Sequence, residues 1–122
     1  MSNNFDVSYW SPKDPSSVEP YFVVWCDEDG DNTGASTDKG ELQGATIASV
    51  TWTVPSGVTK DSDNRAAVTI HGRAYAINTV CTIWLSGGSA DNEYTFVCAI
   101  TTSDSPARTL VKRIILPVRT LV

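Results

Sequence analysis

The sequence lacks a long apolar run, a basic excess and a leader-like start, and each absence excludes a class of protein. No hydrophobic stretch approaches the roughly 18 residues that a membrane-spanning helix needs. The first ten residues contain no basic region followed by an apolar stretch, so we expect no signal peptide and no membrane partner. A formal net charge of −5 argues against a nucleic-acid partner, because phosphate contacts need a basic face.

Residue types that carry chemistry are also scarce. The chain has one histidine, His71, and four glutamates, Glu19, Glu28, Glu41 and Glu93. No serine stands in a nucleophile-elbow pattern, and no glycine loop has the lysine and following helix of a phosphate-binding loop. Catalytic zinc needs three protein ligands, which a single histidine does not supply. We therefore predict that the protein is not an enzyme and holds no cofactor.

Helical periodicity is almost absent, whereas strand-like segments occur throughout the chain. They are Tyr21–Cys26, Ala45–Val54, Ala67–Ile77, Thr79–Ser86, Tyr94–Ser103 and Thr109–Val118. Short strands separated by turn signals are typical of two packed antiparallel sheets. The sequence therefore predicts an all-β, antiparallel β-sandwich of about seven strands, with a closed barrel as the alternative.

The alternation of side chains predicts which residues fill the core. Trp52 and Trp84 are the expected core anchors, because a tryptophan buries a large area. Alternate residues share a face in two of the later segments: Tyr94, Phe96, Cys98 and Ile100 in one, and Leu110, Lys112, Ile114 and Leu116 in the other.

The three cysteines, Cys26, Cys81 and Cys98, have no zinc-type spacing, and each lies in an apolar run. Each is therefore expected to be a small buried side chain. A disulfide between Cys81 and Cys98 would fit if their strands pair, but synthesis in a cytoplasm argues against it.

The first twenty residues differ in composition from the rest. The segment "SPKDPSSVEP" (Ser11–Pro20) has three prolines, which hold the backbone extended and remove hydrogen-bond donors. We predict an extended N-terminal arm over residues 1–20 and a sandwich domain over residues 21–122. The arm carries Phe5, Tyr9 and Trp10, which either pack back on the domain or contact a partner; both alternatives stay open.

An acidic segment follows the first strand-like run. The stretch "CDEDGDNTGASTDKGE" (Cys26–Glu41) contains six of the fourteen acidic residues. Asp27, Asp29 and Asp31 alternate as in some calcium loops, but no register supplies the glycine and glutamate of an EF-hand. A simpler calcium-binding loop is the minor alternative to a solvent-facing loop without metal.

Basic residues gather at the other end of the chain. No acidic residue follows Asp104, whereas Arg108, Lys112, Arg113 and Arg119 all lie beyond it. An acidic loop and a basic final strand can attract neighbouring copies or another protein, although solvated edge charges are the plain alternative. We predict Arg113 and Arg119, together with the three arm aromatics, as partner-contact residues. A carbohydrate-binding module is a further alternative, with stacking residues Trp10, Tyr75 and Tyr94.

Three segments resemble a known family pattern. They are "KDPSSVEPYFVVW" (Lys13–Trp25), "ATIASVTWTVPSGVT" (Ala45–Thr59) and "TIWLSGGSADNEYTFVCAITTSDSPARTLVKRIILPV" (Thr82–Val118). The pattern is common in small virion proteins of tailed bacteriophages, and its most specific part is the Trp-Leu-Ser-Gly-Gly turn at Trp84–Gly88. Such proteins are often described as fibre–tail adaptors, and similar small immunoglobulin-like (Ig-like) proteins decorate phage capsids. Two segments depart from the pattern, a long one at 27–43 and an added one at 61–80.

The resemblance implies an Ig-like β-sandwich and a structural role in the virion, without catalytic residues. The first expectation is an adaptor that attaches a fibre or spike to the tail through protein–protein contacts. The alternative is a capsid decoration or cement protein that stabilises the phage head. The implied partners are other virion proteins (tail, fibre or major capsid protein) and copies of the protein itself, assembled in the host cytoplasm.

Overall fold

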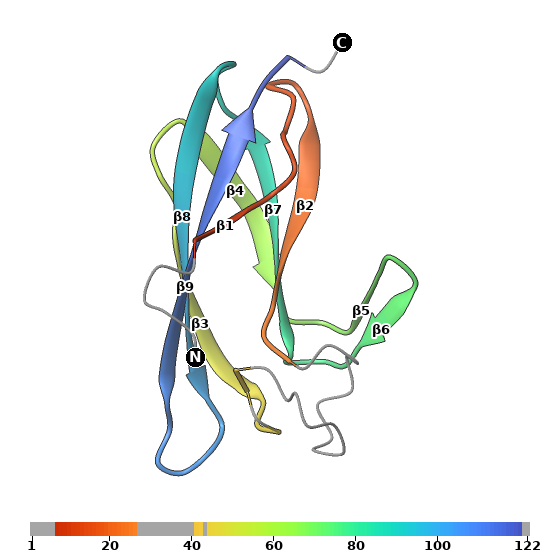
Figure 1. Ribbon diagram of the computed structural model, residues 1–122, viewed down its shortest axis with the longest axis vertical. Helices are drawn as coiled ribbons and strands as arrows, with labels where there is room; N and C mark the ends of the chain where they lie inside the picture. Colours follow the sequence, from red (N-terminus) through yellow and green to blue (C-terminus); the bar gives the residue numbers. More distant parts are fainter. Residues whose placement is uncertain (1–6, 27–40, 43, 121–122) are drawn as a thin grey trace.

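The computed structural model describes residues 7–26, 41–42 and 44–120, which form a β-sandwich (Figure 1). Within these residues every regular element is a strand, which confirms the all-β prediction. The strands are β1 (Val7–Tyr9), β2 (Val18–Val24), β3 (Ile47–Thr53), β4 (Val58–Asn64), β5 (Val68–Ile70), β6 (Arg73–Tyr75), β7 (Val80–Gly87), β8 (Asn92–Thr102) and β9 (Thr109–Val118). Among the described residues, no helix has the length and apolar character needed to cross a bilayer.

Two sheets form the layers of the sandwich. One has four strands in the order β1-β9-β8-β3, and the other has three strands in the order β2-β7-β4. Strands β2, β4 and β7 correspond to B, D and E of an immunoglobulin fold, and β3, β8 and β9 correspond to C, F and G. The added first strand β1 runs parallel to β9. This topology agrees with the expected Ig-like sandwich and leaves both sheets open at their edges.

Two of the nine strands form a hairpin where the sequence predicted one continuous strand. The segment Ala67–Ile77 folds back on itself, because His71 (φ 51°) and Gly72 (φ 81°) both adopt the left-handed conformation that a tight turn requires. The hairpin β5–β6 projects beside the three-stranded sheet (Figure 1).

The edge strand β4 was also missed. Its sequence, VTKDSDN, has only one buried residue, Val58, so it carries no apolar alternation. Backbone pairing with β7 holds it in the sheet, and a register shift between Lys60 and Ser62 interrupts that pairing. Charged side chains and a bulge are common at sheet edges, where they discourage pairing with other chains.

Residues 7–20 lie against the sandwich. The Trp10 amide donates to Ile115 O at 3.0 Å and the Lys13 amide donates to Pro117 O at 3.0 Å, so this segment follows β9. Strand β2 already begins at Val18. The division into an arm over 1–20 and a domain over 21–122 stays a prediction, and Phe5 lies outside the described residues.

The core lies between the sheets, and its fully buried tryptophan, Trp25, was not among the predicted anchors. The prediction for Trp52 holds in part, because it packs against both core clusters. Trp25 is 1% exposed, whereas Trp52 is half-buried and Trp84 is 37% exposed. Trp84 faces outward because its neighbours Ile83 and Leu85 point into the core. The predicted inward faces of β8 and β9 are confirmed: Phe96, Cys98, Ile100, Ile114 and Leu116 are all buried.

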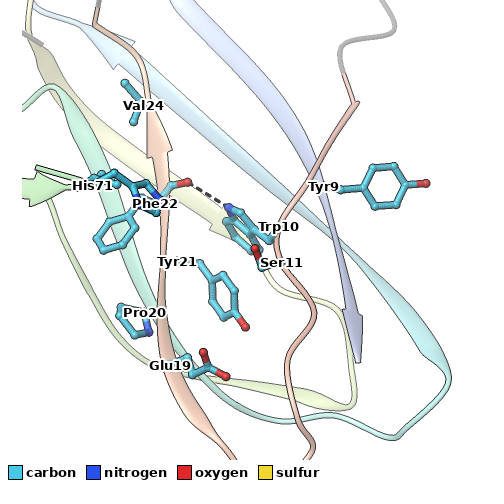
Figure 2. A pocket seen from close by; sticks show the side chains of 10 residues that line it. Tyr9, Trp10, Ser11, Glu19, Pro20, Tyr21, Phe22, Val24 and His71 are labelled. Carbon is cyan, nitrogen blue, oxygen red and sulfur yellow. Dashed lines mark hydrogen bonds between the residues drawn. The ribbon is translucent and has the colours of Figure 1, made fainter. Parts of the chain in front are cut away.

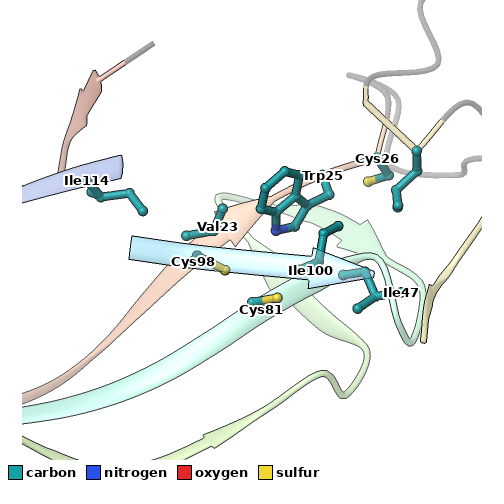
Figure 3. Packing of buried hydrophobic residues seen from close by; sticks show 9 residues of the cluster. Val23, Trp25, Cys26, Ile47, Cys81, Cys98, Ile100 and Ile114 are labelled. Carbon is teal, nitrogen blue, oxygen red and sulfur yellow. The ribbon is translucent and has the colours of Figure 1, made fainter. Parts of the chain in front are cut away.

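All three cysteines are buried, as predicted, and two of them meet across the core. Cys81 lies on β7 and Cys98 on β8, so they belong to different sheets and their strands do not pair (Figure 3). Both side chains are fully buried and free. A hydrogen bond with Cys81, added to burial, raises the pKa of the Cys98 thiol above its usual range.

We expect Cys81 and Cys98 to resist alkylation in the folded protein. Thiol reactivity requires a thiolate with solvent access, and burial denies solvent access to both positions. The raised pKa of Cys98 keeps that thiol protonated as well. Peptide mapping by mass spectrometry after maleimide treatment should find both thiols unmodified in the native protein and fully modified in urea. Rapid labelling of either residue without denaturant would contradict the buried placement.

Candidate interaction surface

The outward face of the four-stranded sheet brings together two residues predicted as separate contacts. The register pairs Val7 with Arg113 and Tyr9 with Ile115, so Tyr9 and Arg113 belong to the same face. The intervening Ile114 is buried on the opposite side. Tyr9 is 63% exposed, and Arg113 is exposed as well.

Small and β-branched residues extend this face across β8 and β3. Arg113 pairs with Val97, which in turn pairs with Thr53, and Val111 pairs with Ala99. Val111 is 48% exposed. We call this surface, centred on Tyr9, Val111 and Arg113, the outer sheet face. A flat surface with exposed apolar side chains and few charges is typical of a protein interaction site.

Arg113 and the other basic residues near it differ in their pairing. Lys112 points toward the core edge, where its Nζ lies 3.3 Å from a Glu41 carboxylate oxygen and donates to Val24 O at 3.0 Å. The same ammonium lies 4.7 Å from the centre of the Trp25 ring. Among the described residues, the Arg113 guanidinium has no ion-pair or hydrogen-bond partner, so its charge is available on the outer sheet face.

Arg108 ties the end of the acidic segment and the residue after it to the β8–β9 loop. Its guanidinium donates to Glu41 O at 2.9 Å and to Leu42 O at 2.8 Å, and it pairs with Asp104 at 2.9 Å. Arg108 and Lys112 are thus engaged within their own chain. Arg119 lies beyond the end of β9 and is exposed, and its backbone amide donates to Lys13 O at 2.9 Å.

Trp10 packs back on the domain. Its ring centre lies 4.9 Å from that of Tyr21 and 5.4 Å from that of Phe96, and its Nε1 donates to Phe22 O at 3.0 Å (Figure 2). The indole therefore connects the two sheets, since Tyr21 and Phe96 lie in different layers. Trp10 thus takes the alternative of packing on the domain, and not that of a partner contact. The Tyr9 ring is exposed, and its contact with a partner stays a prediction.

The other candidate sites gain no geometric support. Asp27, Asp29 and Asp31 lie outside the described residues, and the described part of the chain contains no cluster of metal-ligating side chains. His71 is exposed in the β5–β6 turn. The sugar-stacking residues Tyr75 and Tyr94 pack against the core, and the Tyr94 hydroxyl accepts a hydrogen bond from the Ser89 amide at 2.9 Å.

Comparison with known proteins gives a match to a family model. A family model described as "podophage GP4 fiber-tail adaptor protein gp77" matches residues 13–117. The chain belongs to this family. Neither the curated proteins nor the solved structures gave a match. The family description names a structural adaptor, which points away from catalysis and toward a place in the virion.

The adaptor-family match begins at Lys13, a residue whose structural role the sequence did not reveal. Lys13 is fully buried, and its Nζ donates to Asp14 O and to Gly87 O, each at 2.8 Å. Lysine is rarely fully buried unless its charge is compensated. The contact fixes the segment before β2 to the Trp-Leu-Ser-Gly-Gly turn, so the Lys-Asp-Pro motif touches the most specific part of the family pattern. The position of Lys13 in a Lys-Asp-Pro motif was the only signal available.

Proposed function

We propose that this protein attaches a fibre or spike to the tail of the phage through direct protein–protein contacts. The family match over residues 13–117 carries the proposal. The outer sheet face supports it, because Tyr9 and Val111 expose apolar surface there around the charge of Arg113. Assembly in the host cytoplasm and contacts with other virion proteins belong to the same proposal.

The charge on the outer sheet face favours an unlike partner over a second copy. Near the centre of this face Arg113 is the one charged side chain among the described residues, and the exposed Glu93 lies on the same face four positions along β8 from Val97, the partner of Arg113. Two copies that met face to face near this point would bring two arginines together without a carboxylate between them, and such a like-charge contact costs several kcal/mol. We therefore assign to this face a partner of different sequence that supplies an acidic group and an apolar surface.

Charge reversal at Arg113 tests the contact. We expect Arg113→Glu to lower incorporation of the protein into particles by about tenfold or more, because the acidic partner would then be repelled. The melting temperature should change little, since Arg113 is exposed and unpaired among the described residues. Incorporation is measured by adding purified variant protein to particles that lack it and quantifying bound copies.

Two further variants locate the effect. Lys60→Glu is the matched control, because Lys60 is exposed on β4 in the other sheet, and it should incorporate normally. Arg119→Glu asks whether the contact extends past the end of β9. Normal incorporation of Arg113→Glu would exclude the outer sheet face as the attachment surface. Hundreds of copies bound to the head would favour the alternative of capsid decoration.

A further inference from the structure

The free edge of β2 has an unusual hydrogen-bonding character. β2 is the outermost strand of its sheet, so alternate residues direct their backbone groups away from β7. The other residues of β2 direct their backbone groups toward β7. Trp25 continues this second set, since its amide donates to Thr79 O at 3.1 Å. Phe22 and Val24 therefore present both backbone groups at the free edge.

The carbonyl oxygens of Phe22 and Val24 already accept hydrogen bonds, whereas the amides of the same two residues have no acceptor among the described residues. Phe22 O accepts from Trp10 Nε1 at 3.0 Å, and Val24 O accepts from Lys112 Nζ at 3.0 Å. Both donors come from outside the β2 sheet. Among the described residues, nothing accepts from the outward amides of Phe22 and Val24. Pro20, the next outward residue, has no amide hydrogen. The edge thus offers backbone donors with few free acceptors.

A groove follows this edge. It has a volume of about 390 Å³ and lies between the segment after β1 and the β5–β6 hairpin (Figure 2). Trp10, Pro20 and Phe22 give it apolar walls. Tyr21 also lines the groove, and its hydroxyl is buried without a hydrogen-bond partner in the described structure. Glu19 is the one carboxylate among the described lining residues, and none of them is lysine or arginine.

An ordinary strand is a poor match for such an edge, because its own amides would compete with Trp10 and Lys112 for the same carbonyl oxygens. An extended segment with proline at alternate positions lacks those amides and still offers carbonyl acceptors. Its rings also pack well against aromatic walls. We propose that the β2 groove binds an extended segment of another virion protein in which alternate residues are proline. The carboxylate of Glu19 favours a segment with a basic residue.

This site adjoins the outer sheet face and shares Tyr9 with it, but its other lining residues do not belong to that face. The groove can bind a segment whether or not the outer sheet face contacts a fibre or tail. Together the two surfaces would let one small domain hold two different chains. Binding at the groove is tested on the isolated protein in solution, so the result does not depend on particle assembly.

The experiment is a titration followed by amide NMR spectra. The probe is an octapeptide that alternates proline and threonine and ends in lysine. Its matched control replaces each proline by alanine, which restores the amides and removes the rings. We expect saturable shifts of the Phe22 and Val24 amides and of the Trp10 indole N–H with the proline peptide, at a Kd of about 1 mM or tighter. The alanine peptide should bind at least about tenfold more weakly.

Two variants complete the test. Phe22→Thr keeps a residue suited to a strand and removes the ring. Ile70→Ser removes the apolar side chain on the hairpin side of the groove. Each should weaken the proline peptide about tenfold, while Val111→Thr on the outer sheet face should not. Equal binding of both peptides, shifts at another surface, or no shifts would overturn the proposal. Concentration-dependent shifts of the same amides without peptide would assign the groove to a second copy instead.

Discussion

Replacing Trp25 by alanine is expected to lower the free energy of unfolding by about 3–5 kcal/mol. The indole is 1% exposed and packs in the core cluster with Val23, Cys98 and Ile100 (Figure 3). Its removal leaves a large cavity and takes away the ring beneath Lys112. A domain of this size has a total stability of about 5–15 kcal/mol, so the variant should lose a large fraction of its stability. Urea denaturation monitored by circular dichroism measures the change.

Trp84→Ala is the matched control for this prediction. Trp84 is 37% exposed on the outward side of the three-stranded sheet, and its loss should cost about 1 kcal/mol. A cost at Trp84 equal to that at Trp25 would contradict the assignment of Trp25 as the anchor of the core.

Replacing Lys13 by methionine is expected to lower the free energy of unfolding by about 1–3 kcal/mol. Methionine keeps the apolar stem but removes the Nζ donor to Gly87 O, whereas Asp14 O still accepts from the amide and the hydroxyl of Ser17. Since Lys13 is fully buried, water cannot easily replace the ammonium. The backbone contacts of this segment with Pro117 and Arg119 should persist, so the loss is local.

The same substitution should change how stability depends on pH. Burial lowers the pKa of Lys13 below its ordinary value of 10.5. Between the lowered pKa and 10.5 the unfolded chain binds more protons than the folded one, so this group makes the protein more stable as pH rises through that window. Lys13→Met should remove this contribution.

Lys60→Met serves as the control for both measurements. Lys60 is exposed and pairs with Asp63 at 3.0 Å, and such surface pairs contribute about 0–1 kcal/mol. If Lys13→Met were no more destabilising than Lys60→Met, the hydrogen bond from Lys13 to the Trp-Leu-Ser-Gly-Gly turn would not contribute to stability.

The alternation of side chains along the sequence was sufficient to predict the buried residues where a strand has one face in the core and the other in solvent. β8 and β9 are such strands, and the inward sets through Phe96 and Ile114 were predicted correctly. The rule could not identify β4, which lies at an edge and buries little. It also placed Trp84 in the core, because residue size indicates how much area can be buried but does not indicate which face of the strand a residue occupies.

The candidate interaction surface was predicted as separate residues and not as a surface. Tyr9 and Arg113 were each proposed as contacts, but they are more than a hundred positions apart in the sequence. The parallel pairing of β1 with β9 brings them together, and no local pattern indicates that pairing. The burial of Lys13 and the internal pairing of Lys112 were missed for the same reason, since both depend on contacts between distant segments.

A reconstruction of the intact phage particle tests the proposed adaptor role most directly. We expect the copies of this protein to lie at the tail, with the outer sheet face around Tyr9, Val111 and Arg113 covered by a chain of different sequence. A position on the capsid shell, or a tail position that leaves this face open to solvent, would contradict the proposal.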